Sequence, residues 1–558
     1  MAAGASSGWR WLLGPEGAAS AGLAAAGPDE TPPRTTTLEW LGFGACLAAF
    51  LGLAGWYFAT VGTSIVDDAF IPLRYADRLV HGEGLTFTAG SPVEGYTSLL
   101  WTLLLAAGHL LPLEPLQFAR VAGIVFSVGT LVAVWRAARL VVPGPVSLVA
   151  VALVALNRSM ALWSVEAMDT SLFTCCLAFA LWAWLRHGTR LVHGLPLGGL
   201  AFGLLMLARP EGLLFAVPAG LLGGLAAWRA GRLRAFAVHA ACAAALLGGQ
   251  LAFRLLEYGE LLPNTFHAKV QGAQLGRGLE YLLLWARENV VVLPAAFAVA
   301  GALRLYQTSA RRPELLWLGV SLVGCLAYVA LVGGDYFEFR LLVPTLPPAA
   351  ILAAAGVEAV RRRVPRPGPR AAATALLAAA LLGGSVRAVA VPHENDPWTI
   401  RPDEPGELAE FGWFERTARW LACNIDPRET LAVRPAGVIP YLTGAGALDM
   451  LGLTDREIAR EGRRFAGAPL GHQRLASAEY VRERGATYLV GHPVRSARPI
   501  DDPTLVSAEV APGEWLILLP LRAGATLRPG TYPLGPSSTV LEGWRPRTSG
   551  GRCVPYAR

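Results

Sequence analysis

The sequence contains eleven apolar runs of roughly the 20 residues that an α-helix needs to cross the hydrocarbon core of a bilayer. Inside a bilayer every backbone polar group must be satisfied within the segment, so runs of this length are read as helices. The runs cover residues 39–60, 119–138, 143–157, 170–186, 194–208, 212–228, 235–255, 290–306, 314–332, 341–360 and 371–391. Only 16% of the 558 residues are charged, against about 25% in a soluble chain. The fold class expected is therefore a polytopic α-helical membrane protein with about 11 transmembrane helices.

The run at 98–113 is shorter and ends near Pro112, and we expect it to lie along the interface. With that run outside the count, arginines gather on one set of loops and acids on the opposite set. Because cytoplasmic loops carry the excess of Arg and Lys, we expect a cytoplasmic N-terminus and an outward-facing first loop. The expected location is a bacterial cytoplasmic membrane, crossed many times.

The ends of the chain differ from this middle part. Residues 1–38 are rich in Ala, Gly, Pro and Thr and lack the pattern of a signal peptide, so we expect a disordered cytoplasmic tail. Residues 39–391 form the expected transmembrane domain. Residues 392–558 combine a helical pattern with β-branched runs, which predicts an extracytoplasmic α/β domain. Its Cys423 and Cys553 could pair outside the cytoplasm.

Two adjacent acids, Asp67 and Asp68, follow the first apolar run directly. They precede an amphipathic pattern over 70–79, which predicts a helix lying flat on the bilayer. An acid at a helix start can act simply as a cap, but this explains one aspartate better than two. We expect a catalytic role, in which one Asp is a general base for an acceptor hydroxyl. The other would hold a sugar hydroxyl or a divalent cation, Mg or Mn.

Further polar residues lie at the outer ends of the apolar runs. Glu94 and Tyr96 fit a polyol, although Tyr96 also fits an interfacial aromatic belt. Glu166 and Asp169 are three residues apart and share one helical face. They could bind substrate or, with Asp67 or Asp68, a metal, whereas Asp169 could instead cap the next helix. Arg209 and Glu211 either belong to the site or pair with each other.

Two cations are candidates for binding phosphate. Lys269 is the only lysine in the chain and follows Asn264 and His267 in "LPNTFHAK"; an ammonium there could neutralise a departing phosphate. Arg340 could contact phosphate through two N–H groups or pair with Asp335. No P-loop or GxGxxG motif precedes a suitable helix. An activated substrate would therefore arrive attached to lipid, and no nucleic-acid partner is expected.

The stretch "VDDAFIPLRYADRLVHGEGLTFTAGSPVEGYTSLLW" resembles the first outer loop of GT-C type polytopic glycosyltransferases. The similarity is greatest to terminal arabinofuranosyltransferases that use decaprenyl-phosphate sugar. "LPNTFHAK", "GGDYFEFRLLVP" and "GVIPYLTGAGALDMLGLTD" resemble later motifs of that branch, in the same order. The resemblance covers about residues 39–460 and implies a GT-C-like fold with Asp67 and Asp68 as the catalytic site. At "VEAMDT" the chain departs from the expected Gly-Leu-Glu-Thr-like segment, so Glu166 and Asp169 compete for one role.

The hypothesis is a membrane glycosyltransferase that moves a sugar from a polyprenyl-phosphate donor to an envelope glycan or glycolipid acceptor. The donor phosphate would meet Lys269, Arg340 and Arg74. Sugar or acceptor would contact Glu94, Tyr96, Glu166, Asp169, Arg209, Glu211, Asn264, His267 and Asp335. The alternatives are a transporter or flippase of the same lipid-linked sugar, and a binder without activity.

Overall fold

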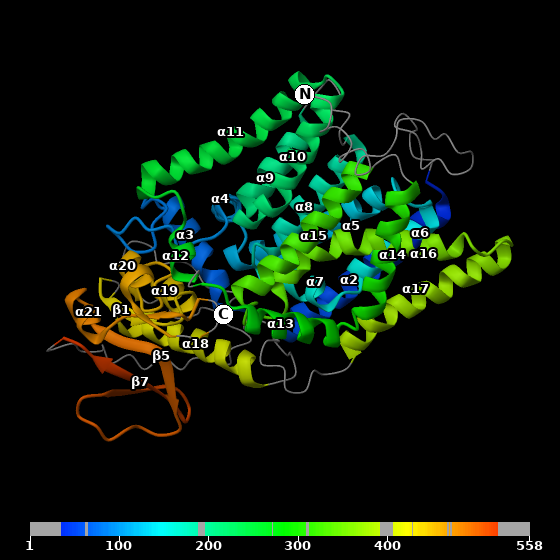
Figure 1. The fold of residues 1–558 in the computed structure, drawn as a ribbon. Helices are drawn as coiled ribbons and strands as arrows, with labels where there is room; N and C mark the ends of the chain where they lie inside the picture. The colour runs from blue at the N-terminus through cyan, green and yellow to red at the C-terminus, as the bar shows by residue number, and fades with distance from the viewer. Residues whose placement is uncertain are drawn as a thin grey trace.

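The computed structural model describes residues 35–61, 65–187, 196–269, 272–308, 312–390, 405–426, 428–465, 468 and 471–522. A long bundle of helices carries a small α/β domain at one end (Figure 1). Most of the tail expected at 1–38 lies outside the described residues. Cys423 is disulfide-bonded, and its expected partner, Cys553, also lies outside them.

Each of the eleven apolar runs contains a helix, because long apolar segments satisfy their backbone polar groups internally. The long helices of the bundle are α2 (Thr37–Val61), α5 (Pro115–Ala138), α6 (Gly144–Ala155), α8 (Thr170–His187), α9 (Leu197–Ala208), α10 (Leu213–Arg229), α11 (Leu233–Tyr258), α13 (Leu275–Glu288), α14 (Val292–Thr308), α15 (Arg312–Val332), α16 (Leu346–Arg361) and α17 (Pro367–Ala390). Within the described ranges, seven helices are long and apolar enough to cross a membrane, or eight if the bent pair α13 and α14 forms one span. Length and composition alone therefore do not reach the expected count of eleven.

Short helices gather where the bundle meets the α/β domain. They are the 3-10 helices η1 (Asp67–Ala69), η3 (Pro210–Gly212) and η4 (Arg340–Thr345), and the α-helices α3 (Phe70–Val80), α4 (Leu99–Gly108), α7 (Arg158–Trp163) and α12 (Asn264–Lys269). The run expected along the interface is α4, whose 10 residues span about 15 Å, half of the hydrocarbon core. Ser98 caps it by accepting from the backbone N–H of Trp101.

The α/β domain is built on a five-stranded sheet with the order β2-β1-β5-β7-β6. Strand β1 is parallel to β2 and β5, whereas β7 is antiparallel to β5 and β6. The elements of the domain are α18 (Pro405–Asn424), β1 (Thr430–Val433), α19 (Val438–Thr443), β2 (Gly446–Asp449), α20 (Arg456–Glu461), β3 (Arg463–Arg464), β4 (Arg474–Leu475), α21 (Ala478–Glu483), β5 (Tyr488–Ser496), β6 (Val506–Ala511) and β7 (Glu514–Pro520). The helical membrane fold with an α/β region is thus confirmed.

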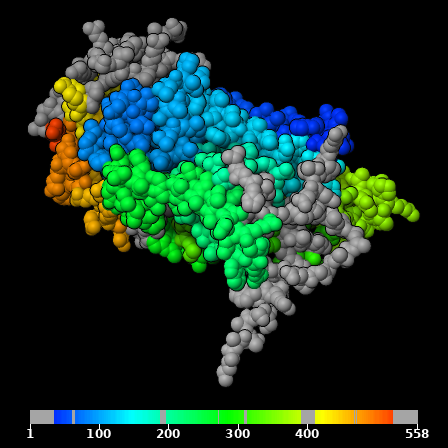
Figure 2. All heavy atoms as spheres, turned by 90° about the horizontal axis from the view of Figure 1, so that it is seen from above, coloured from blue at the N-terminus to red at the C-terminus, as the bar shows by residue number. Residues whose placement is uncertain are grey.

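Buried polar contacts attach the domain to the bundle. The guanidinium of Arg74 on α3 donates to the backbone oxygens of Phe87, Pro440 and Ala445, and the contacts to Phe87 and Ala445 are both 2.7 Å. The amide of Asn264 on α12 donates to the backbone oxygens of Gly452, Leu453 and Asp455 at 2.8 to 3.2 Å. In Figure 2 the orange surface of the domain adjoins the blue surface of the segment that follows α2. The end of the bundle and the domain therefore form one continuous body.

We predict that Arg74→Met lowers the free energy of unfolding by about 3 kcal/mol, because a buried carbonyl that loses a charged donor pays its desolvation cost. Thermal unfolding of the purified protein in detergent measures this. Arg78→Met on the same helix is the matched control, because Arg78 pairs with a half-exposed Glu83 and exposed pairs contribute under about 1 kcal/mol. Equal losses in the two variants would contradict the assigned role of Arg74.

Candidate active site

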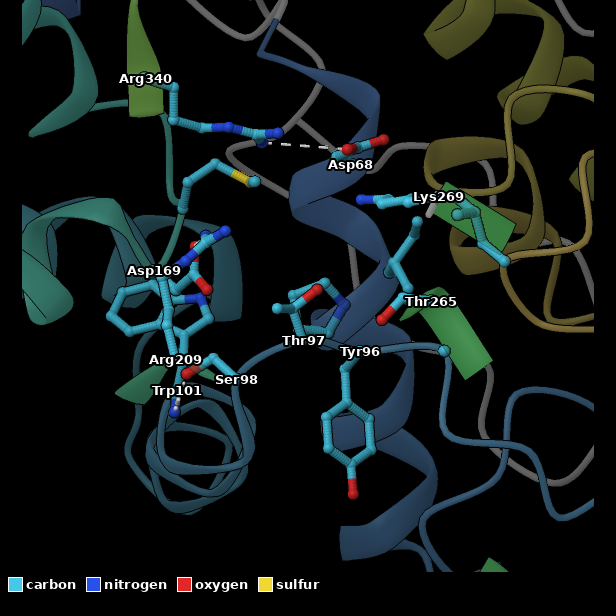
Figure 3. A pocket seen from close by; sticks show the side chains of 15 residues that line it. Asp68, Tyr96, Thr97, Ser98, Trp101, Asp169, Arg209, Thr265, Lys269 and Arg340 are labelled. Atoms are coloured by element: carbon cyan, nitrogen blue, oxygen red, sulfur yellow. Dashed lines mark hydrogen bonds and ion pairs between the residues drawn. The ribbon is translucent and has the colours of Figure 1, made fainter. Parts of the chain in front are cut away.

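A cavity opens where the bundle meets the α/β domain. It has a volume of about 510 Å³, counted out to its open mouth. Its walls come from η1 and α3, the start of α4 and the segment before it, the α7–α8 loop, the junction of α9 and η3, α12, η4 and the loop after β2 (Figure 3). The lining residues are Asp68, Ile71, Pro72, Gly95, Tyr96, Thr97, Ser98, Trp101, Met168, Asp169, Arg209, Thr265, Lys269, Arg340 and Leu453.

The charged residues of this lining are two acids and three cations. Arg340 approaches Asp68, with 3.9 Å between Nη1 and Oδ2, and Arg209 Nη1 lies 2.9 Å from Asp169 Oδ1. Lys269 and Arg340 point toward Asp68 from different sides (Figure 3). Burial lowers the pKa of Lys269 while the charge of Asp68 opposes that shift. With these groups ionised, the lining carries three positive and two negative charges, while Asp335 and Glu211 behind it pair with Arg340 and Arg209.

Asp67 and Asp68 are adjacent in sequence but point to different partners. Both oxygens of Asp67 accept from backbone N–H groups of the α/β domain, Gly437 at 2.7 Å and Val438 at 2.8 Å. Asp68 lines the cavity, and the hydroxyl of Tyr336 donates to its Oδ1 at 3.4 Å. Burial raises the pKa of Asp67 to about 7, which alone would suit a general base. Asp67 does not line the cavity, however, whereas Asp68 does. Of the two carboxylates, Asp68 is therefore the one that can face a substrate there.

Arg340 forms the pair with Asp335 that was one of its two predicted roles, and it also lines the cavity. Its Nε and Nη2 lie 2.8 and 2.7 Å from the buried carboxylate of Asp335, and its Cζ lies 4.7 Å from the ring centroid of Phe337. These contacts fix the guanidinium while Nη1 faces Asp68. Asp335 itself does not line the cavity, so it positions Arg340.

Arg209 forms the expected pair with Glu211, with 3.0 Å between Nη2 and Oε1. It also pairs with Asp169, and the hydroxyl of Tyr328 donates to Glu211 at 3.4 Å. Arg209 and Asp169 line the cavity, whereas Glu211 does not. Glu211 therefore acts on the cavity only through Arg209.

Five further predicted site residues do not line this cavity. Glu94 accepts from Arg254 Nε at 2.8 Å, and Glu166 accepts from the backbone N–H of Val66 at 3.0 Å. His267 lies 3.9 Å from Glu260. Asn264 and Arg74 bind backbone oxygens of the α/β domain. In this geometry none of the five lines the cavity, and the phosphate contact of Arg74 stays a prediction that its backbone partners do not support.

Tyr96 does line the cavity, but its hydroxyl is 3.0 Å from that of Tyr258. Three small polar residues that the sequence analysis did not select, Thr97, Ser98 and Thr265, line it as well. Thr97 and Thr265 directly follow the selected Tyr96 and Asn264, and Ser98 lies two residues after Tyr96. Their closeness to the selected residues was the one sequence signal that could have identified them as part of the site. Such hydroxyl residues also occur as helix caps, however, and Ser98 does cap α4.

Strained backbone accompanies two of the lining segments. Within the described ranges, the residues other than glycine with positive φ are Ala167 (57°), Val290 (48°) and Phe339 (29°). Ala167 directly precedes Met168 and Asp169, and Phe339 directly precedes Arg340. Such conformations persist where surrounding structure enforces them, commonly at functional sites.

The expected metal site was a combination of Asp67 or Asp68 with Glu166 or Asp169. No group of three or more His, Cys, Asp or Glu side chains that could hold a metal occurs within the described parts of the chain. Because Asp67 and Glu166 already accept from backbone N–H groups, Asp68 and Asp169 are the carboxylates left in the cavity. Metal dependence stays a prediction.

Two family models match the chain. Residues 98–249 match the dolichyl-phosphate-mannose-protein mannosyltransferase family, and residues 404–538, most of the α/β domain, match a domain of unknown function.

Three similar proteins agree with the first match. The chain is 31% identical over 280 residues to the terminal beta-(1->2)-arabinofuranosyltransferase of Mycobacterium tuberculosis, covering 45% of this chain and 42% of that protein. It is 30% identical over 381 residues to the protein of the same name from Corynebacterium glutamicum, covering 60% and 53%. The matched regions thus span about half of these relatives. The apo crystal structure of ArnT from Cupriavidus metallidurans superposes with a TM-score of 0.50 at 13% identity, over 74% of this chain and 86% of ArnT.

The resemblance stated from the sequence is confirmed at two levels. The superposition shows the shared fold, and the family match and the two relatives show related sequence over part of the chain. In fold the chain resembles the GT-C-type membrane proteins, and in sequence it is similar to the terminal arabinofuranosyltransferases over the part that it shares with them.

Proposed function

We propose that the protein is a membrane glycosyltransferase that transfers a sugar from a polyprenyl-phosphate donor to a hydroxyl of an envelope glycan or glycolipid. The observation that carries the proposal is the cavity in which the carboxylate of Asp68 faces Lys269 and Arg340. The name of the matched family includes a polyprenyl-type phosphate sugar. The names of the two relatives favour arabinofuranose as the sugar.

In the proposed reaction an acceptor hydroxyl enters the cavity and attacks the anomeric carbon of the donor sugar. Asp68 accepts the proton of that hydroxyl as the new bond between oxygen and carbon forms. The bond between the anomeric carbon and the phosphate oxygen breaks, and its electron pair stays on the phosphate. The leaving polyprenyl phosphate gains negative charge, which Lys269 and Arg340 stabilise more strongly than water would, because the site is partly buried.

Arg340 and Lys269 suit different parts of this task. Arg340 is held in place by Asp335 and Phe337, so its Nη1, which is 3.9 Å from Asp68 Oδ2, presents a fixed donor. Among the described residues, no carboxylate lies within ion-pair distance of the Lys269 ammonium, so its charge is available to a ligand. Asp169 with Arg209 and the hydroxyls of Thr97, Ser98 and Thr265 would bind the sugar. Asp68 and Asp169 would hold Mg²⁺ or Mn²⁺ if a metal takes part, because such ions bind one or two carboxylates together with substrate phosphate.

The rival functions make different demands on the fold. A transporter site is expected near the middle of the membrane, between repeated halves. Here the charged cavity lies at the ends of helices, next to the first residues of α8 and the last residues of α9, which favours the enzyme. We further propose that this end faces outward from a bacterial cytoplasmic membrane, because the acids gather on these loops and the excess of arginines lies on the others.

We predict that Asp68→Asn lowers kcat by about 10²- to 10⁴-fold, the range that a general base contributes. The affinity for the donor should stay within about twofold. Purified protein in nanodiscs would be given a panel of polyprenyl-phosphate sugars, with Mg²⁺ or with a chelator. Mass spectrometry would measure the polyprenyl phosphate released. If the wild-type protein consumes no donor under any of these conditions, the proposal of an enzyme is wrong. Movement of the donor across the membrane without release of polyprenyl phosphate would identify a flippase.

We predict that Lys269→Met weakens inhibition by added polyprenyl phosphate by about 10-fold or more, because it removes a partly buried positive charge facing the leaving group. Lys269→Arg keeps the charge and should restore part of the affinity. The inhibition constant of the product measures both. A constant that does not change in Lys269→Met would place the phosphate elsewhere.

We predict that Asp67→Asn mainly lowers stability, by about 2 kcal/mol, because an amide accepts with one atom only and leaves one of the two N–H groups unsatisfied. Turnover per folded molecule should fall much less than in Asp68→Asn. Thermal unfolding and turnover would be measured on the same preparations. Loss of turnover at unchanged stability would instead make Asp67 the base.

A further inference from the structure

A second cavity lies at the opposite end of α8 from the candidate active site. Its lining residues are Arg136, Arg139, Leu140, Trp182 and Arg186, and its volume is about 580 Å³, counted out to its open mouth. Helix α8 begins at Thr170, directly after Asp169, and has 18 residues, or about 27 Å of length. That length is close to the hydrocarbon thickness of about 30 Å. The two cavities therefore open toward opposite faces of the membrane.

The second cavity is lined by cations without an acid. Arg139 is compensated from outside the lining by Glu39 of α2, with 3.3 Å between Nε and Oε2. Arg136 and Arg186 are exposed, and no carboxylate of the described residues lies within ion-pair distance of either. Two uncompensated guanidinium groups thus share one concave surface with an indole ring.

Position alone would explain single arginines here. Cations are favoured near the C-terminal ends of helices, where the helix dipole is negative, and Arg136 and Arg186 lie in the last turns of α5 and α8. The exposed Arg229, the last residue of α10, is such a case. Arg229 and the exposed Arg234, the second residue of α11, lie on the same side but do not line this cavity. What distinguishes Arg136 and Arg186 is that they converge from two helices on one hollow, walled by Trp182 and Leu140.

We propose that this cavity binds the phosphate group of an anionic lipid. Guanidinium groups bind phosphate oxygens through paired N–H donors, and two of them are available. The source of the phosphate is a lipid headgroup rather than a soluble phosphate, because the cavity lies where helices leave the hydrocarbon layer. Trp182 and Leu140 give it the apolar side that meets acyl chains, and indoles favour this depth. The site is separate from the proposed donor site and does not depend on it.

Native mass spectrometry of the full-length protein, released from detergent with added lipid, tests this proposal. The probes are phosphatidylglycerol, which is anionic, phosphatidylcholine, which carries phosphate without net charge, and inorganic phosphate. The variants are Arg136→Gln/Arg186→Gln and the matched control Arg229→Gln/Arg234→Gln, which removes the same charge from the same side.

We expect phosphatidylglycerol to bind the wild-type protein and the control variant within about twofold of each other. Binding to Arg136→Gln/Arg186→Gln should be at least tenfold weaker, while thermal unfolding without lipid stays unchanged. Equal weakening in both variants would show surface charge without a site and would overturn the proposal. Binding of phosphatidylcholine as tight as that of phosphatidylglycerol would overturn it too, and inorganic phosphate binding as tightly as the lipid would overturn the lipid assignment.

Discussion

The structure depends on how the loop after α2 holds the short helix α19 of the α/β domain. At the start of α19, the carboxylate of Asp67 accepts the backbone N–H groups of Gly437 and Val438. Toward its end, Arg74 donates to the carbonyls of Pro440 and Ala445. An acid thus meets the donors left free at one end, and a cation meets the acceptors at the other. The approach is close: a Cβ on Gly437 would lie 1.8 Å from the backbone oxygen of Asp67.

This contact explains why two acids stand side by side. Asp67 is fixed from both oxygens, so the next residue, Asp68, has a defined position at the cavity wall. The cavity has a second fixed wall, since Asp335 and Phe337 hold Arg340. A charged group that is already held in place loses little freedom when a ligand arrives, which is how preorganised sites stabilise developing charge. In this account Asp67 positions the cavity wall, and Asp68 is the carboxylate that faces the substrate.

Much of the helical part could be predicted from sequence, because a membrane helix is encoded locally in about 20 apolar residues. The short α4 could also be predicted, because its apolar run is shorter than the others. Candidate site residues could be predicted where the nearby sequence was unusual, as with the single lysine and the acids beside apolar runs. Of the predicted residues, Asp68, Asp169, Lys269 and Arg340 all line one cavity. What could not be predicted depends on partners far along the chain. Nothing near Asp67 shows that its partners are 370 and 371 positions away, and Arg74 on its amphipathic helix looks like any other cation.

The central claim is that the cavity between bundle and domain receives a lipid phosphate between Lys269 and Arg340, with the sugar facing Asp68. A cryo-electron microscopy structure of the protein with polyprenyl phosphate tests this most directly. The account predicts phosphate density within hydrogen-bonding distance of both cations and the lipid chain leaving between helices. Phosphate bound elsewhere, with this cavity closed or filled by side chains, would contradict it.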